Sequence, residues 1–180
     1  MQITLRQEIE ADYEKVRNVV QQAFESAPHS DGNEAQLVEN LRTTREFIPE
    51  LSLVAEMDGE IVGHILFSLI HIQGENKEAV QSLALAPVSV LPKFQNKGIG
   101  GKLMEEGHAL ARALGYRSII LLGYPEYYSR FGYASASRWG IRAPFPVPDE
   151  AFMALELVRD GLRGVSGVVR YPEAFEPSKG

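Results

Sequence analysis

The chain has 180 residues, of which 44% are hydrophobic and 23% charged, so it is long enough for about one globular domain and too apolar for a disordered chain. Its 18 Lys and Arg residues stand against 24 Asp and Glu residues, and the net charge of −6 argues against binding to a nucleic-acid backbone. The absence of cysteine excludes disulfides, zinc–thiolate sites and a thiol nucleophile, and no apolar run is long enough to span a membrane. We therefore expect a cytoplasmic protein.

The first part of the chain predicts one strand and two helices. Residues 3–6 alternate like a short strand, and apolar residues recur with helical spacing over residues 13–24. Asp12 is in position to cap this first helix. Asn33, with Gln36 three residues later, marks the start of a second helix.

Three apolar runs then predict a meander of antiparallel strands, at residues 51–57, 61–67 and 79–91. The dipeptide Asp58-Gly59 separates the first two runs, and it is a strong short-range signal for a hairpin.

From Gly98 the pattern becomes helical, and Gly115 is placed to end that helix. The apolar run at residues 118–122 predicts a central strand that is buried on both faces. Pro125 can begin a short helix, which Gly132 would end.

Two further strands are predicted, at residues 151–158 and 165–171. We expect a single domain, residues 1–180, with a core over residues 1–140 and a C-terminal extension over 141–180 that holds the extra strands. The fold class is α+β, with a mixed, mostly antiparallel twisted sheet flanked by helices.

The segment from Val88 to Lys102 carries the clearest chemical signal. A strand ends at Pro92, a basic loop with Gly98 and Gly100 follows, and a long helix begins. The first N–H groups of a helix have no intrahelical partner, and together with the helix dipole they form an anion site. Because glycine has no side chain, a phosphate could approach this backbone closely. The alternative is a glycine-rich turn that only lets helix and strand pack.

Two common phosphate motifs do not fit this segment. A Walker loop needs Gly, four residues and then Gly-Lys-Ser/Thr, and the chain has no such run. A dinucleotide fingerprint would need a third glycine, where this chain has Leu103, and a preceding βαβ unit. A diphosphate bound here would therefore belong to another ligand. The four histidines show no metal-ligand spacing, so we expect no metal.

The QNKGIG segment at Gln95–Gly100 and the tyrosine Tyr128, four residues before Gly132, are two motifs. Together they resemble the GNAT superfamily of acyl-CoA N-acyltransferases, in the bacterial form with extra C-terminal strands. The segment Gln95–Gly100, QNKGIG, resembles that family's Gln/Arg-x-x-Gly-x-Gly/Ala motif. Tyr128 stands four residues before Gly132, as does the tyrosine of the family's second motif. The resemblance covers residues 1 to 135 in element order.

The resemblance implies an N-acetyltransferase that moves the acetyl group of acetyl-CoA directly to an amine in a ternary complex. Tyr128 would donate a proton to the departing thiolate. A splay between strand residues 88–90 and 119–122 would admit the thioester. The coenzyme-binding residues that the resemblance implies are Val88, Ser89, Val90, Gln95, Asn96, Lys97, Gly98, Ile99, Gly100, Gly101, Lys102, Tyr127 and Phe131.

The general base is the point at which this chain departs from the family. Many relatives place a carboxylate on the strand before the first motif, but residues 81–91 contain no acid. An alkylammonium must lose a proton before it attacks, so another base is needed. Glu34 is the candidate for the base or an amine anchor, and its alternative role is to complement the dipole of the second helix. The other candidates are His29, Asp31, His64 and Glu126.

Residues 28–45 are expected to form one wall of the acceptor pocket. The acceptor is a small-molecule or peptide amine, and polyamines, aminoglycosides, amino acids, peptide N-termini and lysine all stay open. We expect no nucleic-acid or membrane partner, and a monomer or homodimer. The alternative function is a coenzyme A-binding sensor or regulatory module with little or no turnover. A structural domain with a chance motif is the third possibility.

Overall fold

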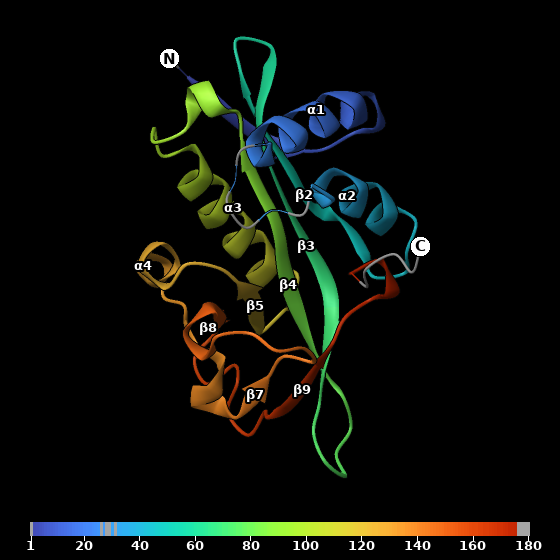
Figure 1. The fold of residues 1–180 in the computed structure, drawn as a ribbon, viewed down its shortest axis with the longest axis vertical. Coiled ribbons are helices and arrows are strands. Elements are labelled where there is room, and N and C mark those ends of the chain that lie inside the picture. Colours follow the sequence, from blue (N-terminus) through green and yellow to red (C-terminus); the bar gives the residue numbers. More distant parts are fainter. Residues whose placement is uncertain (1, 26, 28–29, 31, 176–180) are drawn as a thin grey trace. The chain divides into compact units, whose positions relative to one another are not determined.

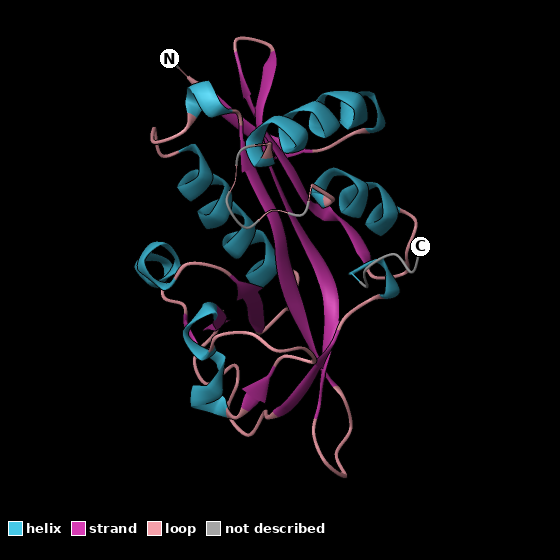
Figure 2. Cartoon of the chain, viewed as in Figure 1, coloured by secondary structure: helices cyan, strands magenta, loops and turns pink. Residues whose placement is uncertain are grey.

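The computed structural model describes residues 2–25, 27, 30 and 32–175 (Figures 1 and 2). The strands are β1 (Ile3–Gln7), β2 (Phe47–Met57), β3 (Glu60–Gln73), β4 (Val80–Val90), β5 (Ser118–Leu122), β6 (Ala134–Ser135), β7 (Ile141–Arg142), β8 (Phe152–Glu156) and β9 (Gly167–Arg170). The α-helices are α1 (Tyr13–Phe24), α2 (Glu34–Arg42), α3 (Ile99–Ala113) and α4 (Pro125–Tyr128). Short 3-10 helices lie at Glu10–Asp12, Pro92–Phe94, Ser129–Phe131, Ala136–Trp139, Asp149–Ala151 and Glu173–Phe175.

The chain forms two compact units, and β3, β4 and α3 each contribute residues to both. The first unit comprises Met1–Ser68 and Ala86–Leu110, and the second comprises Leu69–Leu85 and Ala111–Gly180. That residues 1–180 form a single domain with a C-terminal extension stays a prediction.

The predicted hairpin is confirmed in the first unit. Strands β2 and β3 pair antiparallel, and Met57 faces Glu60 across the turn. The turn residues Asp58 and Gly59 have φ angles of 51° and 80°. Two successive residues with positive φ give the turn that matches the twist of paired strands. Strand β1 adds to the free edge of β2, also antiparallel.

Helices α1 and α2 lie side by side (Figure 1). Their buried positions follow the helical period, and Arg17 of α1 forms an ion pair with Glu39 of α2 at 2.9 Å. The buried residues are Val16, Val19 and Val20 in α1, and Ala35, Val38 and Leu41 in α2.

Two glycines let α3 lie close to β3 in the first unit. A Cβ atom on Gly63 of β3 would lie 3.1 Å from Leu103 and 3.3 Å from Ile99, both on α3. A Cβ atom on Gly107 of α3 would overlap the ring of Phe67. The start of α3 is therefore held against the sheet by close packing on both sides of the contact.

The second unit contains the mixed part of the sheet. Strand β5 pairs parallel with β4 through Leu83↔Ile119 and Ala84↔Ile120, and antiparallel with β8. The first four residues of β5 are buried, which confirms the predicted central strand. Strand β6 extends the sheet beside β8, β9 pairs antiparallel with β3, and β7 pairs parallel with β9. The α+β class with a mixed sheet is confirmed.

The predicted helix ends at glycine are also confirmed. Gly115 has a φ of 94° and donates to the carbonyl of Arg112 at 3.1 Å, while Tyr116 donates to Ala111 at 3.0 Å. Both bonds satisfy carbonyls of the last turn of α3. Gly132, with a φ of 96°, ends the helical stretch that begins at Pro125. No helix in the described part of the chain is long and apolar enough to cross a membrane.

Asp12 and Asn33 stand at the predicted N-cap positions of α1 and α2, but neither side chain makes a capping hydrogen bond. The carboxylate of Asp12 pairs with Arg6 at 2.7 and 2.9 Å and accepts from the Ile9 N–H at 2.9 Å, so it does not cap α1. The hydrogen bonds from Arg6 hold the pKa of Asp12 below its usual value. Gln36 donates to Asn40 at 2.9 Å, one turn further along α2, and so does not reach back to the helix start.

Candidate active site

The loop between β4 and α3 turns a run of backbone amides towards the start of the helix. Asn96 and Gly98 have φ angles of 63° and 80°, and the first hydrogen bond of α3 runs from Lys102 N–H to the Gly98 carbonyl at 3.0 Å. Among the residues that the structure describes, no backbone carbonyl accepts from the N–H groups of residues 96–101. Successive free amides at a helix start form a concave anion site.

The side chain of Gln95 connects this loop to the end of β4. Its Nε2 donates to the Val90 carbonyl at 3.0 Å, and its N–H donates to Pro92 at 3.3 Å. The N–H of Leu91 donates to Val62 of β3 at 2.9 Å, which fixes the end of β4. The loop is therefore held in place before any ligand binds.

The charge around the loop is mostly positive. The ammonium groups of Lys93 and Lys97 lie 5.2 and 5.6 Å from the centre of the Phe94 ring, and Lys102 is exposed in the first turn of α3. That turn contains no acid. Glu60 adds a negative charge 4.0 Å from Lys93. The surroundings suit an anion.

The predicted pantetheine strand is the end of β4. Val88 and Val90 are half-buried, while Ser89 is 2% exposed and its hydroxyl has no hydrogen-bond partner among the described residues. A Cβ atom on Gly63 would lie 3.2 Å from the Ser89 carbonyl, so β3 and β4 are closely packed here. Contact of Val88, Ser89 and Val90 with a coenzyme stays a prediction.

The second unit brings together Tyr127, Tyr128 and Phe131. The N–H groups of Tyr127 and Tyr128 both donate to the Tyr124 carbonyl at 3.1 Å, which forms the turn after β5. The Tyr127 ring lies 4.9 Å from that of Tyr128 and 5.4 Å from that of Phe131. Arg130 lies over Tyr127 at 4.6 Å.

Tyr128 is held among aromatic rings in a largely buried position. Its ring also meets the ring of Tyr133 edge-on at 6.0 Å. Burial, with a smaller contribution from Tyr127, raises the pKa of Tyr128 to about 12. The phenol is therefore protonated at neutral pH, because burial disfavours the phenolate.

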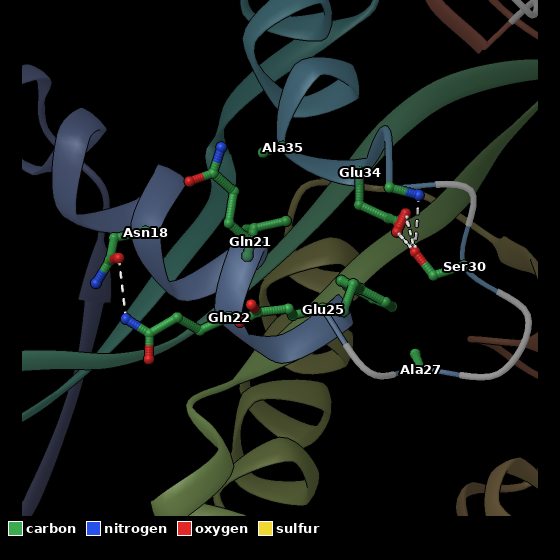
Figure 3. A pocket seen from close by; sticks show the side chains of 11 residues that line it. Asn18, Gln21, Gln22, Glu25, Ala27, Ser30, Glu34 and Ala35 are labelled. Carbon is green, nitrogen blue, oxygen red and sulfur yellow. Dashed lines mark hydrogen bonds between the residues drawn. The ribbon is translucent and has the colours of Figure 1, made fainter.

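Glu34 is the first residue of α2 and lines a cavity of about 680 Å³ beside α1 (Figure 3). The hydroxyl of Ser30 donates to both oxygens of its carboxylate, to Oε2 at 2.9 Å. The described residues that line the cavity are Asn18, Val20, Gln21, Gln22, Phe24, Glu25, Ala27, Ser30, Gly32, Glu34 and Ala35. This set is rich in carboxylate and carboxamide groups, which suits a ligand that donates hydrogen bonds.

Two other candidate bases, His64 and Glu126, lie in very different surroundings. His64 is fully buried on β3, where its Nε2 lies 3.0 Å from Ser52 Oγ and 3.5 Å from a Glu8 oxygen. Burial, and to a lesser degree the charge of Arg42, lowers the pKa of His64 to about 3. His64 is therefore a structural histidine, and its full burial keeps it out of reach of an amine substrate. Glu126 is exposed on the first turn of α4.

His29 and Asp31 lie outside the described residues. Within residues 2–25, 27, 30 and 32–175, no group of three or more His, Asp or Glu side chains could hold a metal ion.

Known proteins match both the sequence and the fold. The model of the Acetyltransferase (GNAT) family matches residues 13–133. An N-acetyltransferase of Escherichia coli K12, YhbS, whose function is uncharacterised, is 34% identical over 172 residues, which cover 95% of this chain and 97% of YhbS.

Two solved structures have the same fold. The structure of Escherichia coli YhbS in complex with CoA has a TM-score of 0.87 at 33% identity, covering 97% of this chain and 92% of that one. The structure of a GNAT family acetyltransferase from Brucella melitensis in complex with acetyl-CoA has a TM-score of 0.79 at 36% identity, covering 97% of this chain and 99% of that one. The resemblance of the two motifs is thereby confirmed, and the chain belongs to the GNAT family of acetyltransferases.

Proposed function

We propose that the protein transfers the acetyl group of acetyl-CoA directly to an amine within a ternary complex. The observation that carries this proposal is the run of amides over residues 96–101 that have no backbone acceptor in the described part of the chain. The run lies at the start of a long helix and beside three lysines. A pyrophosphate carries the charge and the acceptor oxygens that such a loop binds. The presence of CoA and acetyl-CoA in the two solved relatives supports the same ligand here.

In this proposal the coenzyme contacts the continuous segment of residues 88–102 and two aromatic residues further along the chain. The amides of Asn96 to Gly101 hold the pyrophosphate, Lys97 and Lys102 add charge, and Gln95 keeps the loop in shape. The backbone of Val88–Val90 pairs with the pantetheine amides. Tyr127 and Phe131 pack on the coenzyme through their rings.

The transfer itself needs an oxyanion donor and a proton donor. The amine nitrogen attacks the thioester carbonyl and forms the C–N bond, and an N–H group near Val90 stabilises the oxyanion. The C–S bond then breaks and Tyr128 gives its proton to the departing sulfur. The proton that the nitrogen loses as it becomes an amide restores the phenol. Burial raises the pKa of a phenol and of a nearby thiol alike, so the transfer stays feasible in a dry site.

The cavity beside Glu34 is the proposed acceptor site. Glu25 and Glu34 are the charged groups among the described residues that line it, and Asn18, Gln21 and Gln22 add amide oxygens (Figure 3). A cationic amine is the acceptor that this lining favours. Glu34 either takes the proton from the ammonium group or anchors it.

The second candidate function is a coenzyme A-binding module with little turnover. The observation in its favour is that β4 carries no acid and that His64 is buried away from solvent.

One experiment separates these functions. Calorimetry measures binding of CoA, and a thiol-release assay measures turnover of acetyl-CoA against polyamines, aminoglycosides, amino acids and peptides. Binding with turnover on at least one amine supports the transferase. Binding without turnover on any amine supports the sensor, and absence of CoA binding contradicts both.

A further inference from the structure

Gly123 lies directly after β5, at a point where its own backbone does not require glycine. Its φ is outside the left-handed region, and its N–H donates to the Ala151 carbonyl at 2.9 Å. An alanine could adopt this conformation without backbone strain. The backbone conformation therefore does not explain why this position holds a glycine.

The reason is the ring of Tyr128. A Cβ atom on Gly123 would lie 2.8 Å from Cδ2 and 3.3 Å from Cζ of that ring, and closer still to Cε2. These distances are shorter than van der Waals contact, so ring and Cβ cannot both keep their places. The Cδ2–Cε2 edge of the ring, next to the Cζ atom that carries the hydroxyl, thus lies directly on the glycine.

The rest of the ring has little freedom to move away. Tyr127 and Tyr133 meet it edge-on, with ring centres 4.9 and 6.0 Å away. Tyr133 is 3% exposed, and its N–H donates to the Tyr128 carbonyl at 3.4 Å. A side chain at position 123 would therefore move the ring, and the hydroxyl that it carries, from the observed position.

We propose that Gly123 is a positioning residue, whose missing side chain sets where the Tyr128 hydroxyl lies. This rests on the proposed function, in which Tyr128 is the proton donor. A displacement of about 1 Å in a reacting group can lower a rate by about 10²-fold. Gly123 thus acts through Tyr128 and does not itself touch the substrates.

A double-mutant cycle on kcat tests this. We expect Gly123→Ala to lower kcat by about 10- to 100-fold, with the Kd for CoA changed less than threefold. In the Tyr128→Phe background there is no hydroxyl left to misplace, so adding Gly123→Ala should change kcat less than threefold. Gly164→Ala is the control, since a Cβ there meets nothing within 4 Å although its φ is 75°. It should leave kcat as in the wild type.

Each outcome bears on one of the two proposals. Wild-type kcat in Gly123→Ala, or the same loss in both backgrounds, overturns the inference about Gly123. Wild-type kcat in Tyr128→Phe instead overturns the role of Tyr128. Gly123→Ala itself could fail to fold. In that case the double variant Gly123→Ala/Tyr128→Leu should fold, because the clashing ring is gone. If the double variant also fails to fold, the inference is overturned.

Discussion

Glu8 and Arg42 form an ion pair inside the first unit, with Arg42 Nη2 2.6 Å and Nε 3.2 Å from the two carboxylate oxygens. Their side chains are 1% and 9% exposed. Ser52 Oγ donates to Glu8 at 3.0 Å, and the Arg42 guanidinium lies 3.9 Å from the centre of the Tyr13 ring. The pair therefore connects the end of α2 to β2, through Ser52, and to α1, through Tyr13.

Removing one partner of this pair should destabilise the fold strongly. Glu8→Gln leaves the Arg42 charge buried without its carboxylate, and we expect a loss of about 3–5 kcal/mol in the free energy of unfolding. Glu39→Gln is the matched control, because it breaks the exposed pair with Arg17 and should cost less than about 1 kcal/mol. Urea unfolding measures both. Equal losses in the two variants would show that the Glu8–Arg42 pair is no more than a surface interaction.

His64 should make the stability of the protein depend on pH. Burial lowers its pKa to about 3 in the folded chain, against about 6.5 when unfolded. Below pH 6.5 the unfolded chain binds a proton that the folded chain does not, so stability falls as the pH drops from about 6.5 towards 3. The slope from this group is at most about 1.4 kcal/mol per pH unit. Unfolding measured between pH 4 and 8 should show this slope in the wild type and a shallower one in His64→Gln, and identical slopes would exclude His64 as its source.

Replacing Gly98 should weaken coenzyme binding more than replacing Gly59, a glycine with the same φ angle in another part of the chain. Gly98 and Gly59 both have a φ of 80°, and a Cβ on either meets nothing within 4 Å. Gly98→Leu and Gly59→Leu thus carry similar backbone strain, but only the first puts a side chain over the free amides. We expect the Kd for CoA, measured by calorimetry, to rise at least about 100-fold in Gly98→Leu and less than threefold in Gly59→Leu. Similar affinities in the two variants would remove this loop as the pyrophosphate site.

The charge of Glu34 should matter for the acceptor and not for the coenzyme. Glu34→Gln keeps the shape of the side chain and removes its charge, so turnover on a cationic amine should fall about 10- to 100-fold while the Kd for CoA stays within twofold. Glu25→Gln removes the other carboxylate of the same cavity. If Glu34 is the base, only its variant lowers kcat, and if both residues attract the cation, both variants raise KM. Wild-type kinetics in Glu34→Gln on every acceptor would leave Glu34 as a helix-start residue.

Local sequence patterns predicted most of the fold and both motif segments. The Asp58-Gly59 turn, the α3 helix with Gly115 at its end, and the buried β5 strand each follow from short-range periodicity or turn chemistry. The two-residue strands β6 and β7 were missed, because two residues are too few to show a period.

Features that depend on distant contacts were not predictable in this way. Arg42 meets Glu8 across 34 positions of sequence, with no local sign of the pairing. The cap assigned to Asp12 was wrong because Arg6, six residues away, is the stronger partner. The role of Gly123 has no local sign in the sequence, since it depends on where the Tyr128 ring lies.

Tyr128→Phe should lower kcat while leaving the fold and coenzyme binding intact. The variant keeps the ring, and with it the edge-on contacts to Tyr127 and Tyr133, but removes the only proton that the side chain can donate. General acid assistance is worth about 10²–10⁴-fold, so the loss in kcat at saturating substrates should fall in that range. Tyr127→Phe is the comparison, because the two side chains point about 100° apart around the helix, and its kcat should fall far less.

The pattern of losses identifies the proton donor. Thiol release at saturating acetyl-CoA and amine gives kcat, and calorimetry with CoA checks that binding is retained. A loss below about threefold in Tyr128→Phe would mean that water donates the proton or that product release limits the rate. A large loss in Tyr127→Phe in place of Tyr128→Phe would move the role to the neighbouring ring, whose pKa burial also raises. Because the pKa of Tyr128 is raised to about 12, its deprotonation should cause no fall in the wild-type kcat as the pH rises from 7 to 10.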